Sequence, residues 1–482
     1  MEKKMAKNRM AVLAAVLMLG IFTLGSCGND SASSVPTLIW WQIGTRQAGF
    51  NQDEKVISDY IESKIGVRVE YRIAGWADAT TRLNTVINAG EYFDIMFVDG
   101  GTYNRFVSLG AFADITDLVP QAAPGLSEVI PSVLWDGVKV KGRIYSVPTY
   151  KDSSATIFYF WDDAYVQKYN IDLNRSGWAY LDEVFRRVKA GEGQRFYPFY
   201  RAKGDATFVF DGYDDLSTGF PPIGVRLDDG QRRVVLTLEQ SEILQTLRYL
   251  RGWYRDGIIN PDANLITESP KGVMLKIAQA WPSVATLYAA GDGIEKYDPV
   301  KFAGPTFSTG TVQGSMNAIS VNSNYKEEAL RLLELVNTDT TLRDMLAYGI
   351  EGKNFNYTEL DGRRVVNQFN PDTSLVNYQQ GNYFIITPQN NVPATYWEEV
   401  RQQNEAAVPS VMMGFMMDQE PVMTELANVR VVWDRYETDI TFGAQDPDEV
   451  LPKVIGELKA AGLDKIIAEA QRQVDEFAAS QN

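Results

Sequence analysis

The spacing of apolar residues predicts an ordered succession of strands and helices that begins near residue 37. Strands are predicted at Thr37–Trp41, at Val67–Ile73, where apolar and polar residues alternate, and at Phe93–Val98, a continuous apolar run. Asp53–Lys64 and Asp78–Ala89 carry apolar residues at helical spacing. A strand–helix–strand–helix–strand order is typical of a parallel sheet with right-handed crossovers, so we predict a first α/β lobe.

The pattern farther along indicates that the chain leaves this lobe and later re-enters it. Lys141–Tyr150 is predicted to lead out, and Ala155–Phe160 and Leu238–Asp256 to form a strand and a long helix elsewhere. Phe302–Gly314, rich in Gly, Pro and Thr, is predicted to lead back to a strand at Ala318–Val321. We therefore expect an α/β fold of two lobes, each a mainly parallel sheet flanked by helices, joined by hinge crossovers.

These elements suggest domain boundaries. About 455 residues follow Cys27, which exceeds what a single hydrophobic core accommodates. We assign residues 37–148 plus about 315–345 to lobe 1, and residues 149–310 plus about 346–440 to lobe 2. Residues 441–482 are predicted to form C-terminal helices, the last of them amphipathic over Leu463–Phe477.

The first 27 residues have the pattern of an export signal. Basic residues precede the apolar run Ala11–Leu24, which is shorter than the ~20 residues that span a bilayer. The run ends in Leu-Gly-Ser-Cys, and Cys27 is the single cysteine of the sequence. This ending resembles a bacterial lipoprotein signal, in which the cysteine is lipidated and becomes the new N-terminus. Residues 28–36 are small and polar, as in a flexible tether.

Composition narrows the possible chemistry. The sequence has no histidine, so Ser-His-Asp and Cys-His catalysis and histidine-based zinc sites are excluded. A net charge of −16 makes nucleic acid an unfavourable partner. Aromatic residues are plentiful, with 10 Trp, 24 Tyr and 22 Phe, which favours aromatic platforms for a ligand. We expect no cofactor.

Candidate ligand contacts follow from the rule that ligands of such sheets bind beyond the carboxyl ends of the strands. Each candidate also has a structural interpretation: Trp41 could pack in a core, Asp99 could cap a helix, and Tyr150 and Lys151 could be a solvated hinge. Trp397 could lie on a surface helix. The candidates from strand ends and crossovers are Trp41, Trp76, Asp99, Tyr103, Tyr150, Lys151, Asn317 and Trp397.

A metal motif also occurs in the second lobe. Asp172, Asn174, Ser176 and Gly177, followed by Glu183, fit the spacing of a twelve-position calcium loop. A turn followed by a helix start explains the same residues, so we expect no metal.

The order of several short segments resembles the bacterial extracellular solute-binding proteins of carbohydrate ABC importers (family 1). More narrowly, it resembles the lipoprotein branch with a C-terminal domain of unknown function. The segments that carry the resemblance are Leu38–Gly44, Asn88–Ile95, Lys139–Pro148, Tyr348–Lys353, Gly414–Val422, Ala460–Lys465 and Glu469–Asp475.

The resemblance implies a two-lobed periplasmic-binding-protein-like fold (type II) that closes on a carbohydrate, expected to be an oligosaccharide. It implies a monomer on the outer side of the cell membrane, anchored in the bilayer through acylated Cys27, that delivers the sugar to ABC permease subunits. By position it assigns sugar contacts to Gln42, Thr45, Asp99 and Trp281. The hinge segment Thr149–Asp152 departs from the maltodextrin-binding pattern.

Two other functions stay open at this stage. A carboxylate-dependent glycoside hydrolase needs two carboxyl groups ~5–10 Å apart across the sugar bond, and Asp99 has no evident partner in the sequence. A surface adhesin needs no cleft and no hinge, and the crossover-rich middle of the chain argues against it. We therefore expect a non-enzymatic binding protein.

Overall fold

The computed structural model describes residues 35–203, 205, 208–267, 269–372 and 375–480. The predicted signal peptide, the predicted lipidation site Cys27 and the predicted tether as far as residue 34 lie outside the described residues.

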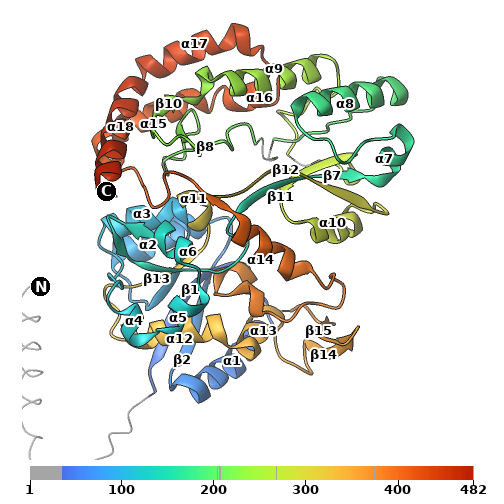
Figure 1. The fold of residues 1–482 in the computed structure, drawn as a ribbon. Helices are drawn as coiled ribbons and strands as arrows, with labels where there is room; N and C mark the ends of the chain where they lie inside the picture. The colour runs from blue at the N-terminus through green and yellow to red at the C-terminus, as the bar shows by residue number, and fades with distance from the viewer. Residues whose placement is uncertain (1–34, 204, 206–207, 268, 373–374, 481–482) are drawn as a thin grey trace, which may run out of the picture. The chain divides into compact units, whose positions relative to one another are not determined.

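The first lobe is built on a sheet with strand order β2-β1-β3-β13-β6 (Figure 1). β1 pairs in parallel with β2 and β3, as the sequence predicts, whereas β13 is antiparallel to both β3 and β6. The strands are β1 (Thr37–Ile43), β2 (Arg68–Ala74), β3 (Ile95–Val98), β6 (Ser146–Pro148) and β13 (Met316–Ile319). The accompanying elements are α1 (Phe50–Ile65), α2 (Ala79–Ala89), α3 (Gly100–Ser108), α4 (Val119–Ala122), α5 (Gly125–Val129), α6 (Ser132–Gly137), α12 (Lys326–Thr338), α13 (Thr340–Tyr348) and the hairpins β4 (Lys139–Val140)–β5 (Arg143–Ile144) and β14 (Phe355–Leu360)–β15 (Arg363–Gln368).

The helices of this lobe bury one apolar face each. α1 buries Phe50, Ile57 and Ile61, which lie on one side of a helix at this spacing. Gly66 ends α1 with a φ of 70°, a left-handed conformation in which its N–H bonds to the Glu62 carbonyl. The chain can therefore reverse at once into β2, which places the carboxyl ends of β1 and β2 at the same edge of the sheet.

The second lobe contains a sheet with strand order β11-β7-β12-β16, and its strand directions differ from the mainly parallel sheet expected from the sequence. β7 is antiparallel to both β11 and β12. The reason is topological: β7 arrives from the first lobe and β12 returns to it, so adjacent strands must run in opposite directions. The strands are β7 (Ala155–Asp162), β11 (Leu275–Gln279), β12 (Tyr297–Phe307) and β16 (Val408–Pro409).

Helices and a small sheet complete this lobe. In Figure 1, α9, α15, α17 and α18 lie together near the C-terminus, and contacts link α17 to α9 and α15 to both α17 and α18. The elements are α7 (Asp163–Tyr169), α8 (Trp178–Glu192), β8 (Tyr213–Asp214), β9 (Ile223–Arg226), β10 (Val234–Leu236), η1 (Thr237–Glu239), α9 (Ser241–Arg255), η2 (Pro282–Val284), α10 (Ala285–Asp292), η5 (Glu420–Val422), α15 (Met423–Trp433), α16 (Glu437–Thr441), α17 (Pro447–Ala460) and α18 (Leu463–Ser480).

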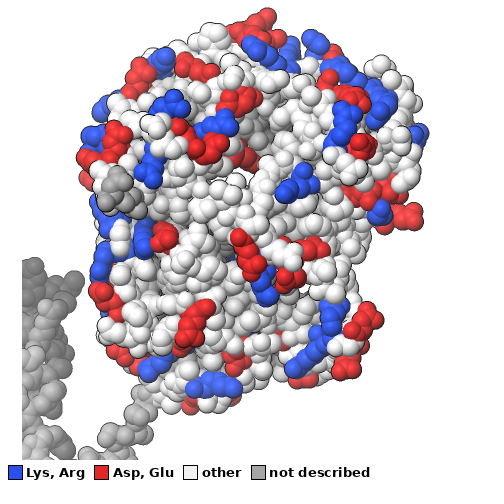
Figure 2. Space-filling model, viewed as in Figure 1, with Lys and Arg blue, Asp and Glu red and all other residues white. Residues whose placement is uncertain are grey.

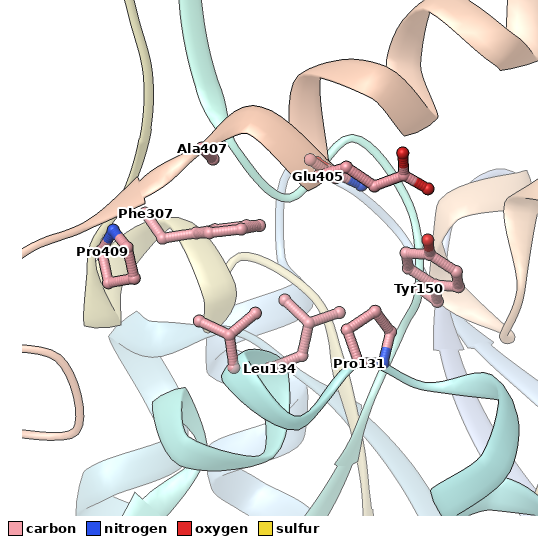
Figure 3. Close-up of a pocket in the computed structure, with 9 residues that line it drawn as sticks. Pro131, Leu134, Tyr150, Phe307, Glu405, Ala407 and Pro409 are labelled. Atoms are coloured by element: carbon pink, nitrogen blue, oxygen red, sulfur yellow. The ribbon is translucent and has the colours of Figure 1, made fainter.

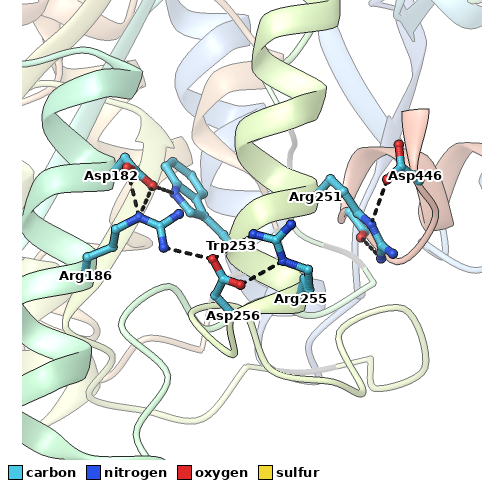
Figure 4. A network of polar contacts seen from close by, with 8 residues as sticks. Asp182, Arg186, Arg251, Trp253, Arg255, Asp256 and Asp446 are labelled. Carbon is cyan, nitrogen blue, oxygen red and sulfur yellow. Dashed lines mark hydrogen bonds and ion pairs between the residues drawn. The ribbon is translucent and has the colours of Figure 1, made fainter. Parts of the chain in front are cut away.

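A polar network joins α8 to the end of α9 inside this helical layer (Figure 4). The indole of fully buried Trp253 donates to Asp182 Oδ1 at 2.8 Å, and Arg186 Nε donates to the same carboxylate at 2.9 and 3.0 Å. Arg186 also donates to Asp256 at 2.8 Å. Asp182 therefore accepts from a buried donor and from a cation.

Connecting segments between the sheets are held to one another by hydrogen bonds. Thr149, which follows β6, donates its N–H and its hydroxyl to the Ser315 carbonyl at 3.1 and 2.9 Å. Ser410 N, after β16, donates to the Phe307 carbonyl at 2.6 Å. The elements along these connections are α11 (Thr309–Val312), η3 (Asn377–Gln379), η4 (Tyr383–Ile385) and α14 (Tyr396–Ala406).

The stretch around η3 packs on the first lobe, although the sequence assigned residues after 346 to the second. The Gln379 side-chain amide accepts from Ile43 N at 2.9 Å and donates to the Ile43 carbonyl at 2.9 Å, beside the end of β1. Fully buried Arg343 donates to the carbonyls of Asn377 and Asn382 at 2.8 and 3.1 Å. Apolar patterning could not locate this stretch, because polar side chains hold it.

We predict that Asp182→Ala lowers the free energy of unfolding by about 1–3 kcal/mol, because it leaves the buried Trp253 indole N–H without an acceptor. The matched control is Asp448→Ala, which removes an exposed ion pair with Arg248 and should cost less than about 1 kcal/mol. Urea denaturation followed by Trp fluorescence measures both. Equal losses would contradict the role of the Asp182 network.

We also predict that Asp214 makes stability depend on pH. Burial raises the pKa of Asp214 to about 7, and the neighbouring Asp215 carboxylate adds to the shift. The folded state therefore binds a proton that the unfolded state releases near pH 4, so this group lowers stability progressively as pH rises from about 4 to 7.

Asp214→Asn should therefore raise the free energy of unfolding at pH 8, by on the order of 2–4 kcal/mol, with the gain shrinking toward pH 4. The control Asp228→Asn should show no gain at pH 8, because the hydrogen bond from Arg226 lowers the pKa of Asp228. Thermal unfolding at several pH values tests this, and a gain for Asp214→Asn that is constant from pH 4 to 8 would refute it.

Candidate functional site

Aromatic side chains from separate elements form a continuous row, which we call the aromatic row: Trp281, Tyr396, Trp397 and Tyr383. The ring centroids of Trp281 and Tyr396 are 5.1 Å apart, those of Tyr396 and Trp397 are 4.6 Å apart, and those of Trp397 and Tyr383 are 4.5 Å apart. The interplanar angles of 81°, 74° and 89° are edge-to-face geometry, which is favourable for aromatic pairs. The row therefore joins the turn before η2, the start of α14 and η4.

Hydrogen bonds fix two members of the row. Trp397 Nε1 donates to the Ile386 carbonyl at 3.1 Å, and Tyr383 N donates to the Tyr150 carbonyl at 2.8 Å. Trp281 Nε1, by contrast, is buried and has no hydrogen-bond partner among the described residues. Buried donors without an acceptor are rare in folded proteins, so this indole N–H is an unsatisfied donor of the row.

A charged pair, Lys151 and Asp152, lies in the connection between β6 and β7. Lys151 Nζ contacts Asp152 Oδ1 at 3.0 Å. Burial raises the pKa of Tyr383 to about 12, and the Asp152 carboxylate adds to that shift. Burial raises the pKa of Tyr396 and of Tyr288 as well, again with a contribution from Asp152. The Asp152 carboxylate therefore interacts electrostatically with Tyr383 and Tyr396 of the row and with Tyr288.

Residues of the first lobe approach the row through Tyr378. Its ring lies 6.1 Å from that of Phe97, in β3. Burial raises the pKa of Tyr378, and the Asp99 carboxylate, at the start of α3, contributes to the shift. Tyr378 in turn contributes to the raised pKa of Tyr383. Because Asp99 interacts electrostatically with Tyr378, and Tyr378 with Tyr383, we group Asp99, Asp152, Tyr378 and the aromatic row as the candidate site.

Several residues predicted from the sequence are in or next to the candidate site. Trp281 and Trp397 belong to the aromatic row, Lys151 pairs with Asp152, and Asp99 adjoins Tyr378. Tyr150 packs against Phe384, with ring centroids 4.5 Å apart, immediately beside Tyr383.

Other predicted residues are in the core of the first lobe, and for these the prediction of ligand contact needs correction. Tyr103 is fully buried and donates its hydroxyl to the Val138 carbonyl at 2.7 Å, because the first turn of α3 faces inward. Asn317 accepts from Trp40 Nε1 at 3.0 Å and donates to the Gln379 carbonyl at 2.7 Å. Gln42 accepts from Gln380 at 2.6 Å.

Trp41 is likewise buried, with the Arg82 guanidinium 5.0 Å from its ring centroid. Both faces of β1 are covered, so Trp41 and its neighbour Trp40 both pack inside, as the structural interpretation of Trp41 allowed. Thr45 and Trp76 are exposed, Trp76 at 56%, at the carboxyl edge of the sheet.

The sequence prediction missed Asp152, Tyr288, Tyr378, Tyr383 and Tyr396. Tyr396 adjoins the predicted Trp397, and Asp152 adjoins Lys151, so closeness in sequence was a usable signal for both. For Tyr378 and Tyr383 the sequence gives no periodic pattern, since 3-10 turns and hydrogen bonds to Arg343 place them.

A separate cavity of about 250 Å³ lies among the connecting segments (Figure 3). Apolar side chains make most of its wall, and Figure 3 shows Glu405 at the rim, beside Tyr150. Its lining residues come from α6 and its approach, from the segment after β6, from β12 and from the end of α14 to β16; they are Pro131, Val133, Leu134, Tyr150, Phe307, Asn404, Glu405, Ala407 and Pro409. This part of the hinge region is incompletely packed.

In the structure, the residues that match the calcium-loop spacing after Asp172 form a turn and an ion pair. Asp172 Oδ1 accepts from Asn174 N at 2.9 Å, as in a turn. Glu183 pairs with Arg175 at 3.0 Å, and the Arg175 guanidinium lies 4.2 Å from the Tyr180 ring centroid. Across the part of the chain that the structure describes, no cluster of three or more Asp, Glu, His or Cys side chains is arranged to hold a metal ion.

The molecular surface carries charges of both signs. On the face in Figure 2, Lys and Arg lie in small groups beside Asp and Glu, separated by broad uncharged areas, consistent with exposed ion pairs such as Arg248–Asp448. Within the described ranges, no helix combines the length and apolar character needed to cross a membrane.

Comparison with known proteins gives two family matches. The model described as bacterial extracellular solute-binding protein matches residues 55–350, and a model described as a domain of unknown function (DUF3502) matches residues 411–479. A carbohydrate ABC transporter substrate-binding protein of Streptococcus pneumoniae is 25% identical over 476 residues, covering 94% of this chain and 95% of the relative.

Solved structures show the same fold. The N-glycan transport solute-binding protein of Streptococcus pneumoniae has a TM-score of 0.82 at 23% identity, covering 93% of this chain and 100% of that one. The structure of its complex with Man5GlcNAc has a TM-score of 0.67 at 24% identity, covering 93% of this chain and 99% of that one. The alginate-binding protein AlgQ2, without calcium ion, gives 0.61 at 16% identity, with 92% and 98% covered. The expected two-lobed α/β fold class is confirmed.

Proposed function

This chain belongs to the bacterial extracellular solute-binding proteins, and from that premise we propose that it captures an oligosaccharide at the aromatic row and delivers it to an ABC permease. The observation that carries the proposal is the convergence of Trp281, Tyr383, Tyr396 and Trp397 with Asp152 at the connection between the lobes.

The chemistry of the candidate site suits a sugar. Sugars present apolar C–H faces and a rim of hydroxyl groups, so a binding site needs aromatic surfaces and a few fixed polar groups. The aromatic row supplies the surfaces. The Asp152 and Asp99 carboxylates accept hydrogen bonds, and the unpartnered Trp281 indole donates one. The name of the Streptococcus pneumoniae relative, a carbohydrate substrate-binding protein, supports the same ligand class.

We propose a hinge mechanism. Asp99 and Tyr378 adjoin the first sheet, whereas Trp281 and Tyr288 adjoin the second. A ligand that contacts both sets stabilises the state in which they are closest, so its differential contacts shift the population toward closure. The cavity beside Phe307 gives the connecting segments room to rearrange.

We also propose a location and a partner. The lipoprotein-like leader supports anchoring through acylated Cys27 on the outer side of the cell membrane. A tether of about ten residues would keep the monomeric binding protein at high effective concentration beside its permease.

Binding without turnover is the expected activity. The candidate site has a second carboxylate besides that of Asp99. It belongs to Asp152 and is paired with Lys151. A glycoside hydrolase would instead use two carboxyl groups with separate acid and nucleophile or base roles.

The test is calorimetric titration of the chain without its leader and Cys27, residues 28–482, with Man5GlcNAc, maltotetraose and kestose, with chromatography of the sugars after prolonged incubation. We expect stoichiometric binding of at least one oligosaccharide and unchanged sugars. Catalytic accumulation of shorter products would overturn the binding function in favour of a hydrolase, and the absence of binding across a wider glycan panel would overturn the ligand class.

We predict that Trp281→Ala weakens oligosaccharide binding at least about tenfold, since it removes one end of the aromatic row and a free indole donor. The thermal midpoint of the unliganded protein should fall far less than in Trp253→Ala, because Trp281 is only half-buried and its indole donates no hydrogen bond to the described residues. Trp253→Ala is the contrasting variant, since Trp253 is fully buried and its loss should mainly reduce stability. A large stability loss in Trp281→Ala would instead make that residue part of the core.

A further inference from the structure

Helix α14 contacts more of the candidate site than its own two aromatic residues account for. Tyr396 and Trp397, at its N-terminal end, belong to the aromatic row. Two polar side chains of the same helix, Glu399 and Asn404, bond to the backbone of segments that carry other residues of the site. These bonds have no part in the binding chemistry described above.

Glu399 holds the turn that carries Trp281. Its Oε2 accepts from Ser283 N at 2.7 Å, two residues after Trp281 and inside η2. Its Oε1 accepts from Thr395 Oγ1 at 2.7 Å, which fixes the carboxylate in place. A hydrogen bond from a backbone N–H to an ionised carboxylate is stronger than one between neutral groups. The Trp281 ring therefore meets Tyr396 at a position set by the helix.

Asn404 holds the segment that carries Asp152. Its Oδ1 accepts from Ser154 N at 3.0 Å, and its Nδ2 donates to the Lys151 carbonyl at 2.6 Å. The side chain is 7% exposed, so losing it would leave buried backbone groups unpaired. Because the bonded groups lie on either side of Asp152, this amide fixes the backbone from which that carboxylate extends.

We propose that Glu399 and Asn404 are positioning residues: α14 aligns Trp281 through Glu399 and Asp152 through Asn404, and ligand affinity depends on both. The inference rests on the proposed function for its effect on affinity. The alignment itself is a property of the unliganded protein, so the two are tested separately.

The first experiment measures the alignment without any ligand. Protein labelled with 5-fluorotryptophan is studied by ¹⁹F NMR, with the Trp281 signal assigned from Trp281→Phe. Glu399→Ala should shift or broaden that signal, and Glu399→Gln, which keeps an acceptor for Ser283 N, should largely restore it. Glu398→Ala is the control, since Glu398 pairs with Arg401 on the exposed side of the same helix. An unchanged Trp281 signal in Glu399→Ala overturns the proposal, whatever the binding assays give.

The second experiment uses double-mutant cycles with Man5GlcNAc, maltotetraose and kestose as probes. Glu399→Ala and Asn404→Ala should each raise Kd about tenfold, and Glu398→Ala should not change it. Combining Glu399→Ala with Trp281→Ala should weaken binding no further than Trp281→Ala alone, whereas combining it with Asp152→Ala should be additive. Asn404→Ala should weaken binding no further when it is combined with Asp152→Ala, and its effect should be additive with that of Trp281→Ala.

A general loss of structure would not make Glu399→Ala non-additive with Trp281→Ala alone and Asn404→Ala non-additive with Asp152→Ala alone. Additive effects on Kd in both the Glu399–Trp281 pair and the Asn404–Asp152 pair would overturn the positioning roles. If the unsubstituted protein binds none of the probes while the Trp281 signal responds as expected, the carbohydrate function fails and the alignment by α14 stands.

Discussion

The hydrogen bonds among the connecting segments are the constraint on which the rest of this molecule depends. The chain passes from one sheet to the other and back, so the segments that do so must lie side by side. Thr149 bonds to Ser315, and Ser410 bonds to Phe307, each time joining parts of the chain that are far apart in sequence. Any closure of the lobes has to take place around these joined segments.

The candidate site lies where these segments meet, which explains its mixed origin. Asp152 comes from the first connection, Trp281 from the end of a strand in the second sheet, and Tyr396 from a helix that follows the first-lobe hairpin β14–β15. No single element could supply this set. The edge-to-face rings and the hydrogen bonds that Tyr383 and Trp397 donate to backbone carbonyls hold residues from these elements in fixed relation without a ligand.

The sequence predicted the architecture well where patterns are local. The alternation in β2 and the helical spacing in α1 and α2 were sufficient for a parallel start to the first sheet. They could not predict that β7 and β12 run in opposite directions, because that depends on where the chain goes next. Trp281 and Trp397 were predicted at the candidate site, and both lie in the aromatic row.

Buried polar residues account for most of the remaining errors. Tyr103 lies in the helix after β3 and Asn317 lies within β13, and the polar atoms of both bond within the protein, which sequence spacing does not reveal. The stretch after α13 was misplaced for the same reason. Apolar periodicity does not predict that Arg343 is buried. Its guanidinium is nevertheless fully buried and bonds to the carbonyls of Asn377, in η3, and of Asn382, after it.

The Gln379 amide has a further consequence for the sheet. β3 pairs with β1 only at Trp40 and Trp41, so the N–H and C=O of Ile43 extend past the end of their neighbour. Backbone N–H and C=O groups that lack a partner inside a protein cost free energy, so these two groups need a substitute partner. By donating and accepting at Ile43, the side chain of Gln379 occupies the place of one more strand residue. A glutamine from a segment 336 residues away in the sequence thus completes the hydrogen bonding of an interior strand at the point where β3 is too short to do so.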